Sequence, residues 1–206
     1  MKLIIFGATG SIGRHVVAQA QADGHQVTAF TRSGQAPKDT PNGVSVIKGD
    51  VLNPIDVANA IEGHDAVICV LGNGAKGGLR AEGTENIVAG MKWHRVTRLI
   101  CQSTLGAGES WGNLNFFWRV IMFGWLLRNV LADHQAQEEI VRQSGLDWTI
   151  IRPAAFTDGP RTGEYRTGFA ATDRSISLKI SRADVADFLL RQLDTASGGK
   201  VIGLSY

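Results

Sequence analysis

The sequence is poor in cysteine, and its charges are nearly balanced. It has only two cysteines, Cys69 and Cys101, each in an apolar run and without the close spacing of metal-binding or redox pairs. This excludes a disulfide framework and is typical of buried thiols in a reducing compartment, so we expect a cytoplasmic protein. The 21 basic residues barely exceed the 19 acidic ones, so the chain lacks the excess of positive charge that is typical of nucleic-acid-binding proteins. We therefore expect a small-molecule partner.

Long hydrophobic runs are also missing. The most apolar stretch, residues 114–127, reads LNFFWRVIMFGWLL; Arg119 interrupts it and Arg128 follows it. It falls short of the ~20 apolar residues that a transmembrane helix needs. At the amino terminus an apolar strand pattern runs straight into glycines, without the basic, apolar and cleavage regions of a secretory signal. We expect neither a transmembrane segment nor an export signal.

Apolar runs and helical patterns alternate along the chain, and this alternation predicts the fold class. The strand-like runs are nearly continuous in Val, Ile and Leu, as in a mainly parallel, doubly wound α/β sheet with helices on both faces. Strands are expected at residues 2–6, 25–31, 44–49, 65–72, 98–104, 147–153 and 200–205, and helices at 11–24, 54–63, 81–94, 133–144 and 181–194. No linker divides the chain, so we expect one domain over residues 1–206. Substrate-side elements are expected at 104–132 and 153–181, the latter in a small carboxyl-terminal lobe.

A glycine-rich loop joins the first predicted strand to the first predicted helix. In GATGSIG, Gly7 permits the turn, Gly10 lets the backbone approach a pyrophosphate, and Gly13 lets the helix pack against the strand. Free N–H groups and the helix dipole would face the anion. Strand, spacing and helix agree, so we predict a Rossmann-like dinucleotide site; the alternative is a tight turn that binds nothing. The other loop residues of the predicted site are Thr9, Ser11 and Ile12.

The end of the second predicted strand indicates which dinucleotide binds. An NAD site usually carries Asp or Glu about 20 residues after the glycines, to hold the ribose 2′-hydroxyl. This chain has Arg32, in the sequence TRSG, instead. A guanidinium forms charge-assisted, bidentate hydrogen bonds to a 2′-phosphate, whereas a carboxylate would repel it. We therefore predict NADPH as the cofactor; otherwise Arg32 is an ordinary solvated residue.

The GxxGxxG spacing, with Thr9 between the glycines, resembles the extended and atypical short-chain dehydrogenase/reductases. In such reductases an Asp and the next residue contact the adenine, which implies that role for Asp50 and Val51; a helix cap is the alternative for Asp50. A glycine after the fourth strand lets the cofactor pass, and Leu71 and Gly72 hold that place. These residues follow predicted strands, at the carboxyl edge where open α/β sheets bind ligands.

The resemblance implies a catalytic serine, but its usual partners are missing. Ser103 ends the fifth predicted strand, where such enzymes carry that serine beside the nicotinamide, and Thr104 follows it. The Tyr-x-x-x-Lys pair that protonates the developing alkoxide is missing, and His134 stands where atypical members often have the lysine. Losing a proton donor costs about 10² to 10⁴ in rate for a simple ketone. We therefore expect a conjugated acceptor, such as a flavin, quinone or bilin. His134 either hydrogen-bonds the ribose or diphosphate or is only a surface cap.

Longer segments resemble the NADPH flavin reductase and biliverdin-IXβ reductase family in order and spacing. They are IFGATGSIG, GDVL, DAVICVLG, EGTENIVAGMKWHRV, SGLDWTIIRP and DGPRTGEY, spread over nearly the whole chain. The resemblance implies a monomeric reductase that binds NADPH and takes flavins or linear tetrapyrroles as substrates in a shallow pocket. Pro153 and Ala155 fall among its cofactor contacts. Mammalian members have a histidine where this chain has Ala155, so any proton role there is lost.

Residues 111–131 are unusually aromatic, with three of the five tryptophans and three of the eight phenylalanines. Apolar residues at 114, 117, 118, 121, 122, 125 and 126 follow α-helical spacing and predict an apolar stripe. We expect a lid against which a planar acceptor stacks, with Phe117 and Trp118 as acceptor contacts. The alternatives are a core helix, or a surface that docks to a membrane or to a second copy in a dimer.

Two classes of function remain. The first is an NADPH-dependent oxidoreductase that transfers hydride to a conjugated acceptor, with nicotinamide supplying most of the chemistry. The second is an NADP-sensing regulator or an assembly factor resembling the NmrA-like proteins, which share the glycine motif and also lack the Tyr–Lys pair. Ser103 favours the enzyme, whereas the aromatic segment suits a docking surface.

Overall fold

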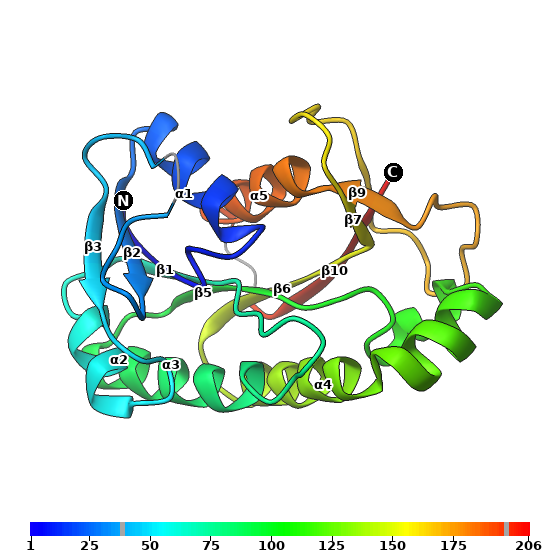
Figure 1. Ribbon diagram of the computed structural model, residues 1–206, viewed down its shortest axis with the longest axis horizontal. Helices are drawn as coiled ribbons and strands as arrows, with labels where there is room; N and C mark the ends of the chain where they lie inside the picture. Colours follow the sequence, from blue (N-terminus) through cyan, green and yellow to red (C-terminus); the bar gives the residue numbers. More distant parts are fainter. Residues whose placement is uncertain (38–39, 196–197) are drawn as a thin grey trace.

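The computed structural model describes residues 1–37, 40–195 and 198–206, and its central element is an eight-stranded sheet (Figure 1). The strand order is β3-β2-β1-β4-β5-β6-β10-β8, and all neighbours run parallel except β8, which is antiparallel to β10. The strands are β1 (Lys2–Phe6), β2 (Gln26–Thr31), β3 (Ser45–Lys48), β4 (Ala66–Cys69), β5 (Arg98–Gln102), β6 (Asp147–Pro153), β8 (Arg166–Thr167) and β10 (Lys200–Ser205). The prediction of a mainly parallel, Rossmann-like sheet is confirmed.

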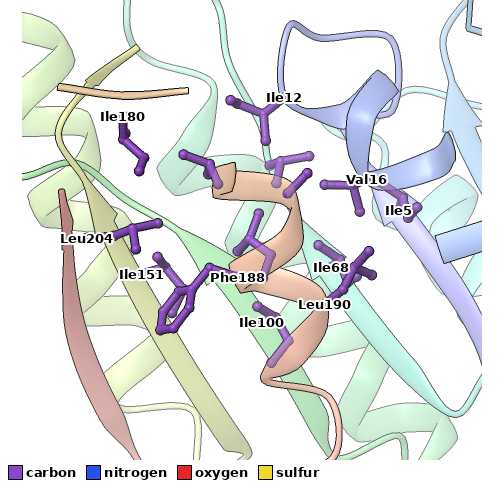
Figure 2. Close-up of a cluster of buried hydrophobic side chains, with 14 of the residues drawn as sticks. Ile5, Ile12, Val16, Ile68, Ile100, Ile151, Ile180, Phe188, Leu190 and Leu204 are labelled. Carbon is purple, nitrogen blue, oxygen red and sulfur yellow. The ribbon is translucent and has the colours of Figure 1, made fainter. Parts of the chain in front are cut away.

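Helices cover both faces of the sheet (Figure 1). On one face lie α1 (Gly13–Ala22) and α5 (Arg182–Arg191), which contact each other; on the other lie α2 (Pro54–Ile61), α3 (Arg80–His94) and α4 (Arg128–Arg142). Alternate residues along the strands pack into two hydrophobic cores, one on each face of the sheet. Ile5, Ile68 and Ile100 face α1 and α5 (Figure 2), whereas Ile4 and Val67 belong to the core beneath α2 and α3. Both faces are therefore dry, which explains the nearly continuous apolar strand sequences.

The sheet has a switch point between β1 and β4. From β1 the chain winds outward through β2 and β3, and it then crosses back by α2 to β4 on the opposite side of β1. The connections that leave β1 and β4 diverge, so a crevice opens at the carboxyl ends of the strands. The loops that follow these strands contain the predicted cofactor residues.

Several elements differ from the prediction. A second sheet, with two parallel strands β7 (Ala155–Thr157) and β9 (Lys179–Ser181), lies beyond β6, and neither strand was predicted. The helix predicted to begin at residue 133 begins at Arg128 instead. Short strands whose partners are far away in the sequence carry too little local pattern to be recognised.

The aromatic segment forms two irregular helices rather than an α-helix. A 3₁₀ helix, η1 (Gly108–Asn113), precedes a π-helix, η2 (Phe117–Leu126), in which the N–H of Leu127 donates to the carbonyl of Met122 at 2.6 Å. A π-helix has more residues per turn than an α-helix, so the predicted apolar stripe is wrong. Of that stripe, Phe117 is 53% exposed and Trp125 73% exposed. No helix among the described residues is long and apolar enough to cross a membrane.

Candidate functional site

A cleft with two adjoining cavities lies at the carboxyl edge of the sheet. The first has a volume of about 430 Å³ and extends over the glycine loop and the ends of β2 and β4. The second, of about 360 Å³, lies over the ends of β5 and β6 and beneath η2. Arg80, Gln102 and Phe156 line both cavities, so the two are connected.

Most residues predicted to bind the cofactor line the first cavity. They are Gly7, Thr9, Gly10, Ser11, Ile12, Arg32, Val51, Leu71 and Gly72. These residues come from four separate stretches of sequence, and the parallel sheet brings them together because each stretch follows a strand. The cavity thus unites the predicted glycine loop, the predicted phosphate contact and the predicted adenine side.

The three glycines of the loop are required for different reasons. Gly7 has φ +87°, and a Cβ there would lie 2.4 Å from the Val70 carbonyl oxygen. Gly13 lies outside the cavity, where a Cβ would come within 2.1 Å of the Gly7 carbonyl oxygen. Gly10 lines the cavity, and a Cβ there would meet only the Gly7 carbonyl oxygen, at 3.1 Å. Gly7 and Gly13 therefore shape the loop, and Gly10 leaves space above it.

The far end of the first cavity carries Arg32, which is exposed and also borders a smaller hollow with Lys48 and Asp50. Asp50 lines this hollow rather than the first cavity, and its carboxylate accepts the N–H of Leu52 at 3.0 Å. The alternative role of Asp50 as a helix cap is wrong, because Asn53 caps α2 by accepting the N–H of Ile55 at 3.0 Å.

The second cavity is largely apolar, and the inner side of η2 covers it. Its apolar lining consists of Leu105, Leu114, Trp118, Phe123, Leu127, Val130, Pro153, Ala154, Ala155, Phe156 and Leu178. Of the two predicted acceptor contacts, Trp118 lines this cavity, whereas Phe117 does not and is 53% exposed. The polar residues Ser103, Thr104, His134 and Arg182, together with Arg80 and Gln102, complete the lining.

The side chain of Ser103 is fully buried and is held by a carboxylate. Its hydroxyl donates to Glu138 Oε1 at 2.6 Å, and Glu138 also forms an ion pair with Arg152 at 2.6 Å. Burial alone would raise the pKa of Glu138, but hydrogen bonds from Arg152 and Ser103 outweigh it and hold the pKa below its usual range. The carboxylate is therefore ionised and accepts the hydroxyl hydrogen bond of Ser103. Ser103 lines the second cavity with its hydroxyl hydrogen directed to Glu138, and its catalytic role stays a prediction.

His134 is buried, with 3% of its surface exposed, and so is not a surface cap. Gln137 Nε2 donates to Thr84 Oγ1 at 3.0 Å, so Gln137 Oε1 is free to accept from His134 Nδ1, 3.3 Å away. This network assigns the proton to Nδ1 and leaves Nε2 as an acceptor. Burial lowers the pKa of His134 to about 4, which keeps the ring neutral near pH 7. The ring is thus suited to accept a hydrogen bond from a ribose hydroxyl and not to supply a proton.

Arg80, which no sequence motif marks, lies where the two cavities meet. It is 7% exposed and pairs with Asp133 at 3.3 Å. Asp133 also accepts the N–H groups of Arg80 and Ala81, and so caps the first turn of α3 from α4. Arg80 Nε is buried without a hydrogen-bond partner among the described residues. Its pairing with Asp133 spans the sequence from α3 to α4, which no local pattern reveals.

Neither tyrosine lines either cavity. Tyr165 donates to Asp187 Oδ2 and Tyr206 to Asp184 Oδ2, both at 2.6 Å, and both acids lie buried on α5. Burial and the bond to Asp187 raise the pKa of Tyr165 far above its usual value. The DGPRTGEY motif therefore anchors its loop to α5 and supplies no proton donor to the cleft.

The fold and the cleft define a Rossmann-type dinucleotide-binding protein, with a glycine loop at the switch point and an apolar cavity beside it. The sequence pattern of the NAD(P)H-binding family matches residues 7–196, and the chain belongs to this family. The predicted cofactor class is confirmed by this match, and so is the resemblance to atypical short-chain dehydrogenase/reductases.

Known proteins similar to this chain differ in their named chemistry. An uncharacterized sugar epimerase, YhfK of Bacillus subtilis, is 29% identical over 205 residues, covering 94% of this chain and 88% of its own. The oxidoreductase ylbE from Lactococcus lactis superposes with a TM-score of 0.79 at 27% identity, covering 100% of this chain and 90% of that one. The anaerobilin reductase ChuY from Escherichia coli O157:H7 has a TM-score of 0.80 at 23% identity, with 100% and 97% coverage.

Proposed function

We propose that the protein is an NADPH-dependent reductase that transfers hydride to a planar, conjugated acceptor bound in the second cavity. The observation that carries this proposal is the direct connection of the glycine-loop cavity to an apolar cavity lined by Trp118 and Phe123. Aromatic side chains offer a flat ligand a large contact area at little entropic cost. The named reductase and oxidoreductase among its structural neighbours support redox chemistry.

The second cavity offers no matched proton donor, which favours an acceptor that needs none at the moment of hydride transfer. Ser103 donates its hydroxyl hydrogen bond to Glu138, His134 is neutral with an acceptor nitrogen, and both tyrosines lie elsewhere. Hydride addition to a flavin, quinone or bilin leaves a negative charge spread over a conjugated system. Water can then protonate the product. The protein therefore needs only to bind the two reactants, orient them and exclude water during hydride transfer.

The roles of the chain's own residues follow from their places. The N–H groups of the glycine loop would hold the pyrophosphate, and Arg32 the 2′-phosphate. His134 Nε2 would accept a ribose hydroxyl at the junction toward the second cavity, with Arg80 beside it. Thr104, Pro153 and Ala155 would form the floor between nicotinamide and acceptor.

The function is tested by NADPH oxidation with flavin mononucleotide, a water-soluble quinone and biliverdin as acceptors. We expect turnover with at least one of them and no tightly bound flavin in the purified protein. If NADPH binds but none of these acceptors is reduced, the NADP-sensing alternative replaces the enzyme.

The cofactor preference depends on Arg32. Replacing Arg32 by Ala is expected to weaken NADPH binding by about 10- to 100-fold, since charge-assisted bonds to a phosphate contribute ~1.5 to 3 kcal/mol, while NADH binding stays unchanged. Calorimetric titration with both cofactors measures this. Lys92→Ala, an exposed cation on α3, is the matched control and should bind both cofactors like the wild type. Equal wild-type affinity for NADPH and NADH would contradict the assignment.

The two sides of η2 allow a matched test of the acceptor cavity. Trp118→Ala removes an aromatic side chain from the lining and should raise the acceptor KM about tenfold, with NADPH affinity unchanged. Phe117→Ala removes an aromatic neighbour that faces outward and should leave both constants as they are. Steady-state kinetics at saturating NADPH distinguish the two variants. A KM that rises in both variants, or in neither, would argue against the acceptor site.

A further inference from the structure

The outer side of η2 is an apolar surface without a partner. Phe116 is 75% exposed and Trp125 73% exposed, and four neighbours share this side. We refer to Phe116, Phe117, Val120, Ile121, Trp125 and Leu126 as the outer face. Trp93 on α3 is equally bare, at 80%, but it is the only large apolar residue of its helix with such exposure. The outer face is therefore a continuous feature and not a scatter of single residues.

The outer face cannot turn inward, because the opposite side of η2 is already in use. Trp118, Phe123 and Leu127 line the second cavity and pack onto the core between the sheet and α5. A helix that is apolar on all sides needs an apolar environment on all sides. In Figure 1 this segment, the green helix before α4, projects at one end of the long axis of the molecule. The apolar environment for the outer face must therefore come from outside the chain.

The charges around the outer face are positive. No acidic residue occurs between Glu109 and Asp133, whereas Arg119 and Arg128 both lie in that stretch. Arg119 donates to the carbonyls of Trp111 and Gly112, and no carboxylate pairs with it among the described residues. Arg128 is exposed and makes no ion pair with a described residue.

A second segment adds to this positive charge. Asn113 donates to the carbonyls of Ala170 and Asp173, which ties the loop around residue 173 to η1. Asp173 is neutralised by Arg166 at 2.8 Å, and the exposed Arg174 beside it has no such partner among the described residues.

We propose that the outer face docks onto the surface of an anionic lipid bilayer. Aromatic and aliphatic side chains enter the boundary between headgroups and acyl chains, and the flanking arginines contact anionic headgroups. The helix is too short to cross the bilayer and lies along it. A second copy fits less well, because a symmetric contact would set the same unpaired arginines against each other without an acid.

Docking there would place the second cavity beside the membrane. Only η2 lies between the second cavity and the outer face, since Trp118 and Phe123 of η2 and the adjoining Leu127 line the cavity. An acceptor dissolved in the bilayer would then have a short path to the nicotinamide side. The docking itself does not depend on turnover, so it can be tested without any acceptor.

The test is co-sedimentation of the full chain with vesicles made of equal parts phosphatidylcholine and phosphatidylglycerol, compared with pure phosphatidylcholine. We expect the wild type to bind the anionic vesicles, with a blue shift of tryptophan emission. The double variant Phe116→Ser, Trp125→Ser should bind them at least about tenfold more weakly, because it loses two inserted aromatic side chains. Trp93→Ser removes an equally exposed tryptophan elsewhere and should bind like the wild type.

NADPH titration shows that each variant is folded and should give wild-type affinity. If the double variant does not fold, Arg128→Glu with Arg174→Glu replaces it, and this charge reversal should abolish binding to anionic vesicles. Absence of wild-type binding to these vesicles would overturn the proposal. So would a wild-type dimer in sedimentation velocity that the double variant converts to a monomer, since the outer face would then contact a second copy.

Discussion

Glu138→Gln is expected to lower the free energy of unfolding by about 3 kcal/mol at pH 7. Arg152 is 2% exposed, and Glu138 accepts two hydrogen bonds from it, at 2.8 and 2.6 Å. A glutamine of the same shape keeps the packing but leaves a buried guanidinium with only Glu109, whose side chain is 63% exposed, to balance it. Breaking a buried pair costs far more than forming it contributes, because the remaining charge stays desolvated. Urea unfolding followed by circular dichroism measures the loss.

Glu139→Gln is the control for this variant, since Glu139 is the exposed neighbour on α4 and should cost less than ~0.5 kcal/mol. The pH dependence gives an independent check. The pKa of Glu138 is lower in the folded than in the unfolded protein, so its contribution is present above the unfolded pKa and is lost as the pH falls through the folded one. The difference between wild type and Glu138→Gln should therefore shrink in acid. Equal losses for both variants would show that the Arg152 pair is unimportant.

The sheet and its flanking helices could be predicted because their signals are local. Each buried strand is a short apolar run, and a glycine in a left-handed conformation follows three of the helices, α1, α2 and α4. Gly24, Gly63 and Gly145 have φ of +83°, +75° and +71°. The glycine loop was predictable for the same reason, since strand, loop and helix follow one another within a few residues.

The inner parts of the site could not be predicted, because contacts distant in sequence determine them. The hydroxyl of Ser103 is held by Glu138, which is 35 residues further on. Arg80 is positioned by Asp133, which is 53 residues away. His134, Asp133 and Glu138 all belong to α4, so one helix sets the chemistry of the second cavity. Sequence spacing gives the chain position of these residues but not their partners.

The aromatic segment shows a different limit. Its composition predicted a helix near the acceptor, but the side chains that face the cavity depend on the helical period. With α-helical spacing Trp118 would share its stripe with residues 121, 122 and 125. In the π-helix it lines the cavity with Phe123 and Leu127 instead. Residues 121 and 125 are exposed on the other side. A change of period therefore exchanges the residues expected to bind an acceptor with those left for an external surface.

Gly10→Val is expected to weaken NADPH binding by more than about 100-fold while the protein stays folded, because its side chain would occupy the space that a pyrophosphate needs. A Cβ at Gly10 meets only the Gly7 carbonyl oxygen, at 3.1 Å, which a shift of a few tenths of an ångström relieves. Gly13→Ala tests the opposite case. Its Cβ would lie 2.1 Å from the same carbonyl oxygen, where backbone must move, so we expect a loss of several kcal/mol in stability.

Thermal unfolding and NADPH titration together separate these two outcomes. Gly10→Val should melt near the wild-type temperature and bind NADPH poorly, whereas Gly13→Ala should melt much lower. Because Gly10 and Gly13 lie on one loop, a general disturbance of that loop would affect both variants alike. Wild-type NADPH affinity in a folded Gly10→Val protein would mean that the pyrophosphate does not approach this glycine, and the cofactor would have to lie differently over the loop.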